Sequence, residues 1–277
     1  MVSSIGTNLS NQKQDVHDFW NKASCGEDLY LLSTDKAGYL AQAKARYDLE
    51  GQMIFDFAKF GQTKNLKVLE VGVGLGADHQ QFAEAGAELF GIDLTERAIE
   101  RTRHRLNTFG LKSNLVVGDA ENLNFADQSF DRVYSWGVLH HSPNTSKAIE
   151  EVWRVLKQGG VANIMIYHKW SIIGFILWLR YALFGLRPWL TLNQIYDRYL
   201  ESPGTKAYSV KEAKKLFAHF KEVRIKTVLT HGDLLESNAG QRHQGRLLSL
   251  AKKIWPRGLI RRFFPQSGLF MLIEARR

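Results

Sequence analysis

The chain has 277 residues, 44% of them hydrophobic and 23% charged, so it can bury a core, and its composition excludes a wholly disordered protein. The 37 Lys and Arg residues outnumber the 28 Asp and Glu residues, and the formal net charge of +9 either favours anionic partners or serves solubility alone. The single cysteine, Cys25, excludes an intrachain disulfide and is consistent with a cytoplasmic location.

The sequence predicts no transmembrane segment. Its N-terminus is polar and lacks the apolar stretch of a signal peptide. The longest apolar run, over residues 171–186, is shorter than the roughly 20 residues that a spanning helix needs, and Arg180 interrupts it.

Helical and strand patterns alternate along the chain. Apolar residues at helical spacing predict helices over residues 11–23 and 36–60, before the first strand. Further helices are predicted at 77–85, 95–107, 145–156 and from 209, and strands at 67–71, 87–92, 115–117, 130–135, 161–167, 223–229 and 269–275. Gly159-Gly160 predicts a turn before the fifth strand. Strands alternating with helices indicate a doubly wound α/β sheet, in which ligands bind beyond the carboxyl ends of the strands.

The chain is expected to divide into an N-terminal helical cap, residues 1–66, and a main domain, residues 67–277. Two insertions, 168–207 and 230–267, leave from the ligand-binding edge, and we expect them to form helical lids over an acceptor pocket. The first is rich in aromatic residues: Trp170, Phe175, Trp178, Phe184 and Trp189. The second is basic and has no acid between Ser237 and Gln266. It predicts an anionic or peptide substrate, peripheral contact with an anionic membrane, or a lid whose basic face meets water.

Acidic residues accompany three successive strands around a glycine-rich turn, residues 71–77. A carboxylate at Glu70 would repel a pyrophosphate, but it would attract the sulfonium and ammonium groups of S-adenosylmethionine. Asp93 ends the second strand and can accept both hydroxyls of a ribose, while Asp119, after the third, can accept from an adenine amino group. The glycines alone also match the dinucleotide fingerprint, so the three acids together carry the prediction.

These segments resemble the class I S-adenosylmethionine-dependent methyltransferases. The matching segments are VLEVGVGLGAD (68–78), GIDLT (91–95), residues 118–143 and EEVWRVLKQGG (150–160). The resemblance implies a Rossmann-like sheet of seven strands with an antiparallel last strand, and S-adenosylhomocysteine as product. The cofactor-binding residues expected from the acids and the resemblance are Glu70, Gly72, Gly74, Gly76, Asp93, Leu94, Asp119, Ala120, Glu121 and Trp136. One departure is Gln158, where many relatives have proline before the glycines.

Candidate catalytic residues follow the fourth and fifth strands. Histidine titrates near neutrality and suits a general base, and in similar enzymes a histidine at the place of His141 lies by the acceptor. We predict His141 and then His140 as catalytic, with Tyr167 as a further candidate. The alternative is that the histidine pair only caps its loop or orders the cofactor. No residues have zinc-ligand spacing, so no metal is predicted.

The predicted function is transfer of a methyl group to an oxygen or nitrogen of a hydrophobic small molecule, natural product or modified peptide, with carboxylate O-methylation as one version. Two alternatives stay open: a nicotinamide-dependent oxidoreductase, and a non-catalytic module that binds S-adenosylmethionine. Nucleic acid is the least favoured partner, because the chain lacks a recognisable RNA-binding appendage. The sequence names neither the acceptor atom nor the oligomeric state.

Overall fold

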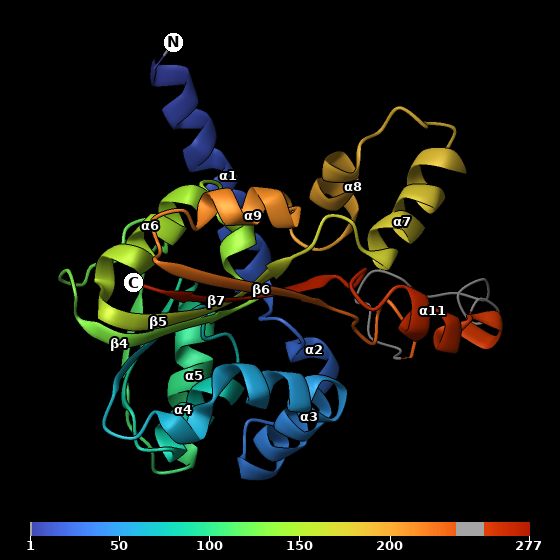
Figure 1. Cartoon of the computed structure of the whole chain (residues 1–277). Coiled ribbons are helices and arrows are strands. Elements are labelled where there is room, and N and C mark those ends of the chain that lie inside the picture. Colours follow the sequence, from blue (N-terminus) through green and yellow to red (C-terminus); the bar gives the residue numbers. More distant parts are fainter. Residues whose placement is uncertain (1, 237–251) are drawn as a thin grey trace.

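A computed structural model describes residues 2–236 and 252–277, with side chains from residue 11 onward. A seven-stranded sheet with the order β3-β2-β1-β4-β5-β7-β6 forms its centre (Figure 1). The strands are β1 (Lys67–Val71), β2 (Glu88–Asp93), β3 (Asn114–Val117), β4 (Phe130–Trp136), β5 (Leu156–Tyr167), β6 (Glu222–Val228) and β7 (Phe270–Arg276). The first five are parallel, and β7 runs antiparallel to both neighbours. The predicted fold class, including the antiparallel last strand, is confirmed.

Helices cover both faces of this sheet. The main helices are α1 (Val2–Lys22), α2 (Glu27–Tyr30), α3 (Lys36–Ala58), α4 (Ala77–Glu84), α5 (Glu96–Thr108), α6 (Thr145–Val155), α7 (Ile172–Trp178), α8 (Leu192–Tyr199), α9 (Val210–Leu216) and α11 (Arg257–Phe263). Shorter turns are η1 (Phe60–Gln62), η2 (Leu139–His141) and the π-helical η3 (Leu179–Leu183). In Figure 1, α6 and α9 lie on one side of the sheet, and α3 and α4 on the other.

Strand alternation builds a core on each face. Leu69 and Val133 pack in one cluster with residues of α6 and α9, whereas their neighbours Val68 and Tyr134 pack in the other with Ile54 of α3. Successive side chains of a strand point to opposite faces, so a strand buried on both faces carries continuous apolar residues. The order of the strands reverses between β1 and β4, so the connections after these two strands lead in opposite directions along the sheet and leave a crevice for a ligand at their carboxyl ends.

Two elements begin five or more residues earlier than expected. The first helix begins at Val2 rather than at residue 11. The predicted turn at Gly159-Gly160 is wrong, because both glycines lie within β5. Gly159 has φ +77°, and the pairing with β4 shifts register between Phe130↔Leu156 and Arg132↔Val161. A β-bulge therefore takes up the extra residues without ending the strand.

The N-terminal helices are anchored to the sheet domain by buried charged groups. Arg105 of α5 is 1% exposed and donates hydrogen bonds to the side chains of Gln42 and Gln80 and to the carbonyls of Tyr39 and Leu75. A buried guanidinium costs much free energy unless its donors are satisfied, so this network fixes α3 against α5.

The first insertion forms a small unit with a core of its own. Leu177, Ala182, Leu190 and Ile195 pack together across α7, η3 and α8. The base of α7 is tied to the end of the second insertion by a hydrogen bond from Ile172 N to Ser267 O, 2.9 Å long. Figure 1 shows α7 and α11 at the same end of the sheet.

The second insertion is described only in part. Residues 230–236 and 252–267 are described, whereas Arg242, Arg246, Leu247, Leu248 and Leu250 of the basic segment lie outside the described residues. Within the described part of the chain, no helix is long and apolar enough to cross a membrane.

Candidate active site

The turn between β1 and α4 is built from glycines in the left-handed region. Gly72, Gly74 and Gly76 have φ values of +85°, +51° and +73°. A Cβ atom on Gly72 would lie 2.2 Å from Cγ2 of Val138, and one on Gly76 would lie 2.9 Å from Thr102. The turn therefore packs between the loop after β4 and helix α5, where side chains do not fit.

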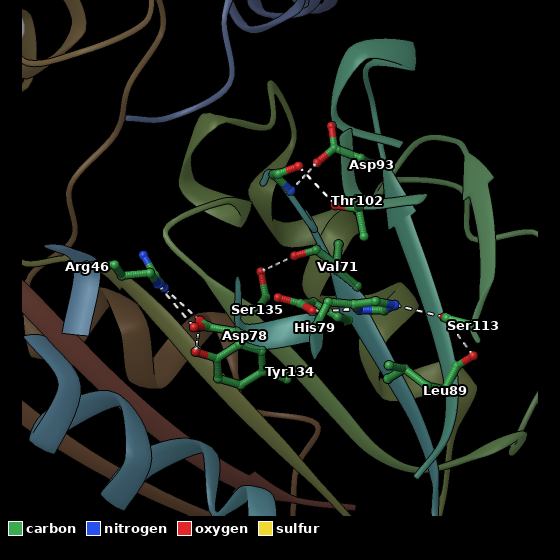
Figure 2. Close-up of polar contacts among 12 residues, drawn as sticks. Arg46, Val71, Asp78, His79, Leu89, Asp93, Thr102, Ser113, Tyr134 and Ser135 are labelled. Carbon is green, nitrogen blue, oxygen red and sulfur yellow. Dashed lines mark hydrogen bonds and ion pairs between the residues drawn. The ribbon is translucent and has the colours of Figure 1, made fainter. Parts of the chain in front are cut away.

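Asp93 lies at the end of β2 beside this turn. Its Oδ1 atom accepts from the backbone N–H and hydroxyl of Thr95, at 3.0 and 2.9 Å. Its Oδ2 atom accepts from Gly74 N at 3.2 Å, the contact drawn at Asp93 in Figure 2. Burial raises the pKa of Asp93, although these hydrogen bonds oppose the shift. Asp93 and Leu94 line the same cavity as the glycines, so the carboxylate is held in place for a ligand's hydroxyl groups.

The two acids after β3 occupy different positions. Asp119 and Ala120 line the cavity, and Lys13 of α1 donates to Asp119 at 2.6 Å. Glu121, also predicted to bind cofactor, does not line it. Its carboxylate accepts from the Ser142 hydroxyl and the Asn144 backbone, each at 2.7 Å. Glu121 thus joins two loops at the rim and positions the cavity wall.

Glu70 lies at the base of the cavity with a partner inside the protein. It is 3% exposed and lies 2.8 Å from Nδ1 of His79, whose Nε2 lies 2.8 Å from the Ser113 hydroxyl (Figure 2). Ser113 donates its one hydroxyl proton to the Leu89 carbonyl, so His79 Nε2 must carry a hydrogen.

The hydrogen bonds that link Glu70 through His79 and Ser113 to the Leu89 carbonyl limit the number of protons in this network. Burial raises the pKa of Glu70 and lowers the pKa of His79 to about 3, which favours a neutral pair. Glu70 and Nδ1 of His79 therefore share one proton, and the pair as a whole carries no net charge. The Glu70 carboxyl group is thus bonded inside the protein, and its expected contact with a cationic ligand stays a prediction.

Arg46 is a site residue that the sequence reasoning missed. It lines the cavity from α3 and makes two bonds to Asp78, Nε–Oδ1 at 3.0 Å and Nη2–Oδ2 at 2.6 Å (Figure 2). The hydroxyl groups of Tyr47 and Tyr134 also donate to Asp78. Burial acts to raise the pKa of Asp78, but Arg46 and these hydrogen bonds outweigh it and lower the pKa. The guanidinium is a group that can meet the carboxylate of an amino-acid ligand.

His141 and Tyr167 lie together, joined by Glu201. His141 is 5% exposed, with Nδ1 at 2.8 Å from the Ser202 hydroxyl and Nε2 at 3.4 Å from the Glu201 carboxylate. The Tyr167 hydroxyl donates to the same carboxylate oxygen at 2.8 Å. All three residues line the cavity, so the first insertion contributes an acid that the sequence reasoning did not single out.

His140 is separated from the cavity that it was predicted to serve. It is 0% exposed, and its ring lies between those of His141 and Tyr167, with centroids 4.3 and 4.0 Å away. Burial lowers its pKa well below the usual range. A neutral, enclosed imidazole packs the wall and does not reach an acceptor.

One His and Glu cluster among the described residues has the spacing of metal ligands. Ligand atoms of His140, His141 and Glu201 lie within 4.8 Å of one another. However, Glu201 and His141 already bond to Tyr167 and Ser202, and the His140 ring is held in the stack. We draw no metal site from this cluster.

The site as a whole is one cavity of about 500 Å³. The glycine turn, Asp93, Asp119 and Arg46 form one end. The other end is mostly aromatic and aliphatic: Trp20, Tyr30, Trp136, Tyr167, Ile173, Leu177, Leu200, Leu235, Leu269 and Phe270. The first end can hold a nucleoside and an amino-acid tail, and the second can hold an apolar molecule beside them.

The comparison with protein families decides what kind of domain has this cavity. Residues 69–164, which include the glycine turn, Asp93, Asp119 and His141, match a family described as a methyltransferase domain. These residues form a methyltransferase domain of the class I S-adenosylmethionine-dependent type. This family uses S-adenosylmethionine as methyl donor, so the alternative of a nicotinamide-dependent oxidoreductase is not supported.

Several methyltransferases are similar to the chain. A sterol 24-C-methyltransferase of Yarrowia lipolytica is 35% identical over 152 residues, which are 54% of this chain and 38% of that enzyme. The methyltransferase GfsG of Streptomyces halstedii is 28% identical over 182 residues, 60% of this chain and 63% of that protein. The chain thus spans less than two thirds of the length of these relatives.

Solved structures share the fold at low identity. Haemonchus contortus phosphoethanolamine N-methyltransferase 2, in complex with S-adenosylhomocysteine, superposes with a TM-score of 0.62 at 17% identity, over 95% of this chain and 60% of that one. The [4+2]-cyclase SpnF superposes with a TM-score of 0.53 at 13% identity, over 86% and 81% of the two chains.

The glycine turn of this methyltransferase gives a first prediction. Gly72→Ala is expected to weaken S-adenosylhomocysteine binding about tenfold or more and to lower the melting temperature, because the added methyl group would clash with Val138 at a positive φ. Gly110→Ala is the matched control: its φ is also positive, no atom lies within 4 Å of its added Cβ, and it does not line the cavity. Calorimetric titration and thermal denaturation measure both effects, and equal affinities of the two variants would contradict the expectation.

Proposed function

We propose that the protein transfers a methyl group from S-adenosylmethionine to an oxygen or nitrogen of a hydrophobic small molecule, natural product or modified peptide, and releases S-adenosylhomocysteine. The observation that carries the proposal is the continuous cavity. It joins the glycine turn and Asp93 to a mostly apolar chamber that holds His141, Tyr167 and Glu201.

The arrangement suits the needs of methyl transfer. The sulfonium donor is already activated, so the enzyme must align an acceptor lone pair with the methyl carbon and, where required, remove a proton. The acceptor's lone pair forms a bond to the methyl carbon while the bond between that carbon and sulfur breaks. The electron pair of the broken bond stays on sulfur, which becomes a thioether. His141 is the candidate base, and the Ser202 hydroxyl, 2.8 Å from its Nδ1 atom, positions its ring in the chamber.

The relatives support a small-molecule acceptor. The similar enzymes include a sterol 24-C-methyltransferase and a phosphoethanolamine N-methyltransferase. By their names, the first methylates a carbon atom and the second a nitrogen atom. Both names describe small molecules, and the aromatic chamber of this chain has room for such a molecule beside the cofactor.

The cofactor assignment is tested with Asp93→Ala. We expect the variant to bind S-adenosylhomocysteine about ten- to a hundredfold more weakly in calorimetric titration, because the acceptor of the ribose hydroxyl groups is lost. The exposed Glu88→Ala on the same strand is the control and should bind like the wild type. A wild-type protein that fails to bind S-adenosylhomocysteine at micromolar concentration would refute the proposed function. Cofactor binding without methylation of any acceptor in a broad panel would favour the non-catalytic module.

The role of His141 is tested by separating turnover from affinity. His141→Ala is expected to lower transfer of a tritiated methyl group by roughly a hundredfold, the size of a lost general base, with little change in S-adenosylhomocysteine affinity. His219→Ala, away from the cavity, serves as the control. A loss of affinity as large as the loss of turnover would instead assign His141 to cofactor binding.

We also propose that the lid face rests on an anionic lipid surface. Phe184, Leu186 and Trp189 are 77%, 81% and 73% exposed, and the segment from Trp170 to Leu190 contains basic residues but no acid. Around α11, Ile254 and Phe263 are 74% and 62% exposed. Five basic residues in these two segments are also exposed: Arg180, Arg187, Lys253, Arg261 and Arg262, of which Arg261 pairs with Glu236. Exposed apolar side chains interleaved with basic ones match the boundary between lipid headgroups and acyl chains.

Vesicle sedimentation tests this surface. The wild type should sediment with phosphatidylcholine vesicles that contain about one third phosphatidylglycerol, and added salt should reduce the bound fraction because it screens the charges. The triple variant Phe184→Ser, Leu186→Ser, Trp189→Ser should lose most of this binding. Leu32→Ser, which is 89% exposed in the N-terminal region, is the matched control. Equal sedimentation of both variants would overturn the lipid assignment.

A further inference from the structure

Two carboxylates occupy the acceptor end of the cavity. Glu50 of α3 and Glu201, which follows α8, both line it, with side chains 14% and 31% exposed. Burial raises the pKa of Glu50 to about 7; the charges of Asp78 and Glu201 act in the same direction, and Arg46 opposes them. The charges of both glutamates also act on the Tyr167 hydroxyl. The two acids therefore share one chamber.

Glu50 forms no direct ion pair with the nearest guanidinium, that of Arg46, although the charge of Arg46 acts on its pKa. Trp136 lines the same cavity, and Nδ1 of His231 lies 3.7 Å from the Glu50 carboxylate. Burial lowers the pKa of His231, so that ring is neutral near pH 7. Arg46 directs its guanidinium to Asp78. Over the described ranges, no Lys or Arg nitrogen forms an ion pair with Glu50 within 4.0 Å.

Unused hydrogen-bonding groups face the same space. Nε2 of His141 and Nδ1 of His231 are buried and have no hydrogen-bond partner within the described part of the chain. His141 is 95% buried, and both residues line the cavity. Buried polar atoms are nearly always satisfied in native proteins, so these nitrogens point to a polar group on the molecule that fills the chamber.

The charge of that group follows from the cost of desolvation. A neutral apolar acceptor would displace water from Glu50 and favour its protonated form. An anionic acceptor would be repelled by the carboxylates of Glu50 and Glu201. A basic nitrogen would favour the ionised form of Glu50, and the rings of Trp20, Tyr30 and Trp136 would add cation–π attraction. The carboxylates would also offset its repulsion from the sulfonium.

We infer that the acceptor is an amine on an apolar body, and that Glu50 and Glu201 hold its nitrogen for methylation. The inference rests on the proposed methyl transfer and narrows its acceptor atom from oxygen or nitrogen to nitrogen. A carboxylate or His141 takes one N–H proton. The freed lone pair then forms the N–CH₃ bond, while the carbon–sulfur electron pair returns to sulfur. The amine inference replaces the expectation that the acceptor is a carboxylate.

A set of three probes with one apolar body tests the inference. The affinities of 4-phenylbutylamine, 4-phenylbutan-1-ol and 4-phenylbutyrate are measured by calorimetry on the full chain saturated with S-adenosylhomocysteine. We expect the amine to bind about tenfold more tightly than the alcohol, and the carboxylate to bind most weakly. Glu50→Gln should reduce the preference for the amine by about tenfold, and Glu201→Gln should reduce it in the same direction.

Matched controls separate this inference from the proposed function. Glu222→Gln, an exposed acid outside the cavity, should keep the wild-type preference. Each variant is first titrated with S-adenosylhomocysteine, and one that does not bind it is treated as misfolded. The test then relies on the remaining variant of the pair Glu50→Gln and Glu201→Gln. Wild-type protein that does not bind S-adenosylhomocysteine would refute the methyltransferase proposal itself. Normal cofactor binding with equal affinities for the amine and the alcohol, or an unchanged preference in both glutamine variants, would overturn the amine inference alone.

Discussion

The positive φ values in the turn after β1 are the constraint on which the rest of the site depends. Because Gly72 has no side chain, the turn closes against Val138, and Gly76 closes against Thr102 on the other side. This contact lets the Gly74 N–H reach Asp93 on the next strand. Arg105 then bonds to the Leu75 carbonyl within the turn and to Tyr39 and Gln42 of α3. The position of the N-terminal helices, and with them Arg46 and Glu50, therefore follows from the geometry of the turn.

Burial assigns different charges to acids that look alike in the sequence. Glu70 shares one proton with buried His79, so that pair carries no net charge, whereas the pKa of Asp78, eight residues later, is lowered because Arg46 and two tyrosine hydroxyl groups bond to it. In a medium of low polarity, a carboxylate keeps its charge only where a cation or several donors compensate for the lost water. Asp78 and Glu50 differ for the same reason: Arg46 bonds directly to Asp78, and it acts on Glu50 only through its charge.

Local patterns predicted the sheet and much of the cofactor end of the site. Each depended on short-range signals: the alternation of strands and helices, glycines at fixed spacing, and acids at strand ends. Arg46, Glu50 and Glu201 could not be found in this way, because they come from α3 and the segment after α8 and meet only in the folded chain. One weak signal existed, since Gln42, Arg46 and Glu50 recur every four residues on α3 and so share a face. His140 shows the opposite error: its neighbour lines the cavity, but its own ring is packed into the wall.

The net charge of the chain is a poor guide to what enters its cavity. A charge of +9 suggested an anionic substrate, yet among the described basic residues of the insertions, Arg180, Arg187, Lys253, Arg261 and Arg262 are exposed to solvent, and Lys252 lines the cavity. The groups that face the acceptor space include Glu50, Glu201 and neutral imidazoles. Charges on a surface act on partners through water and salt, whereas charges in an enclosed chamber act at contact distance in a less polar medium. A basic exterior and an acidic chamber are therefore compatible: the first can hold the enzyme at an anionic surface, and the second selects the atom that is methylated.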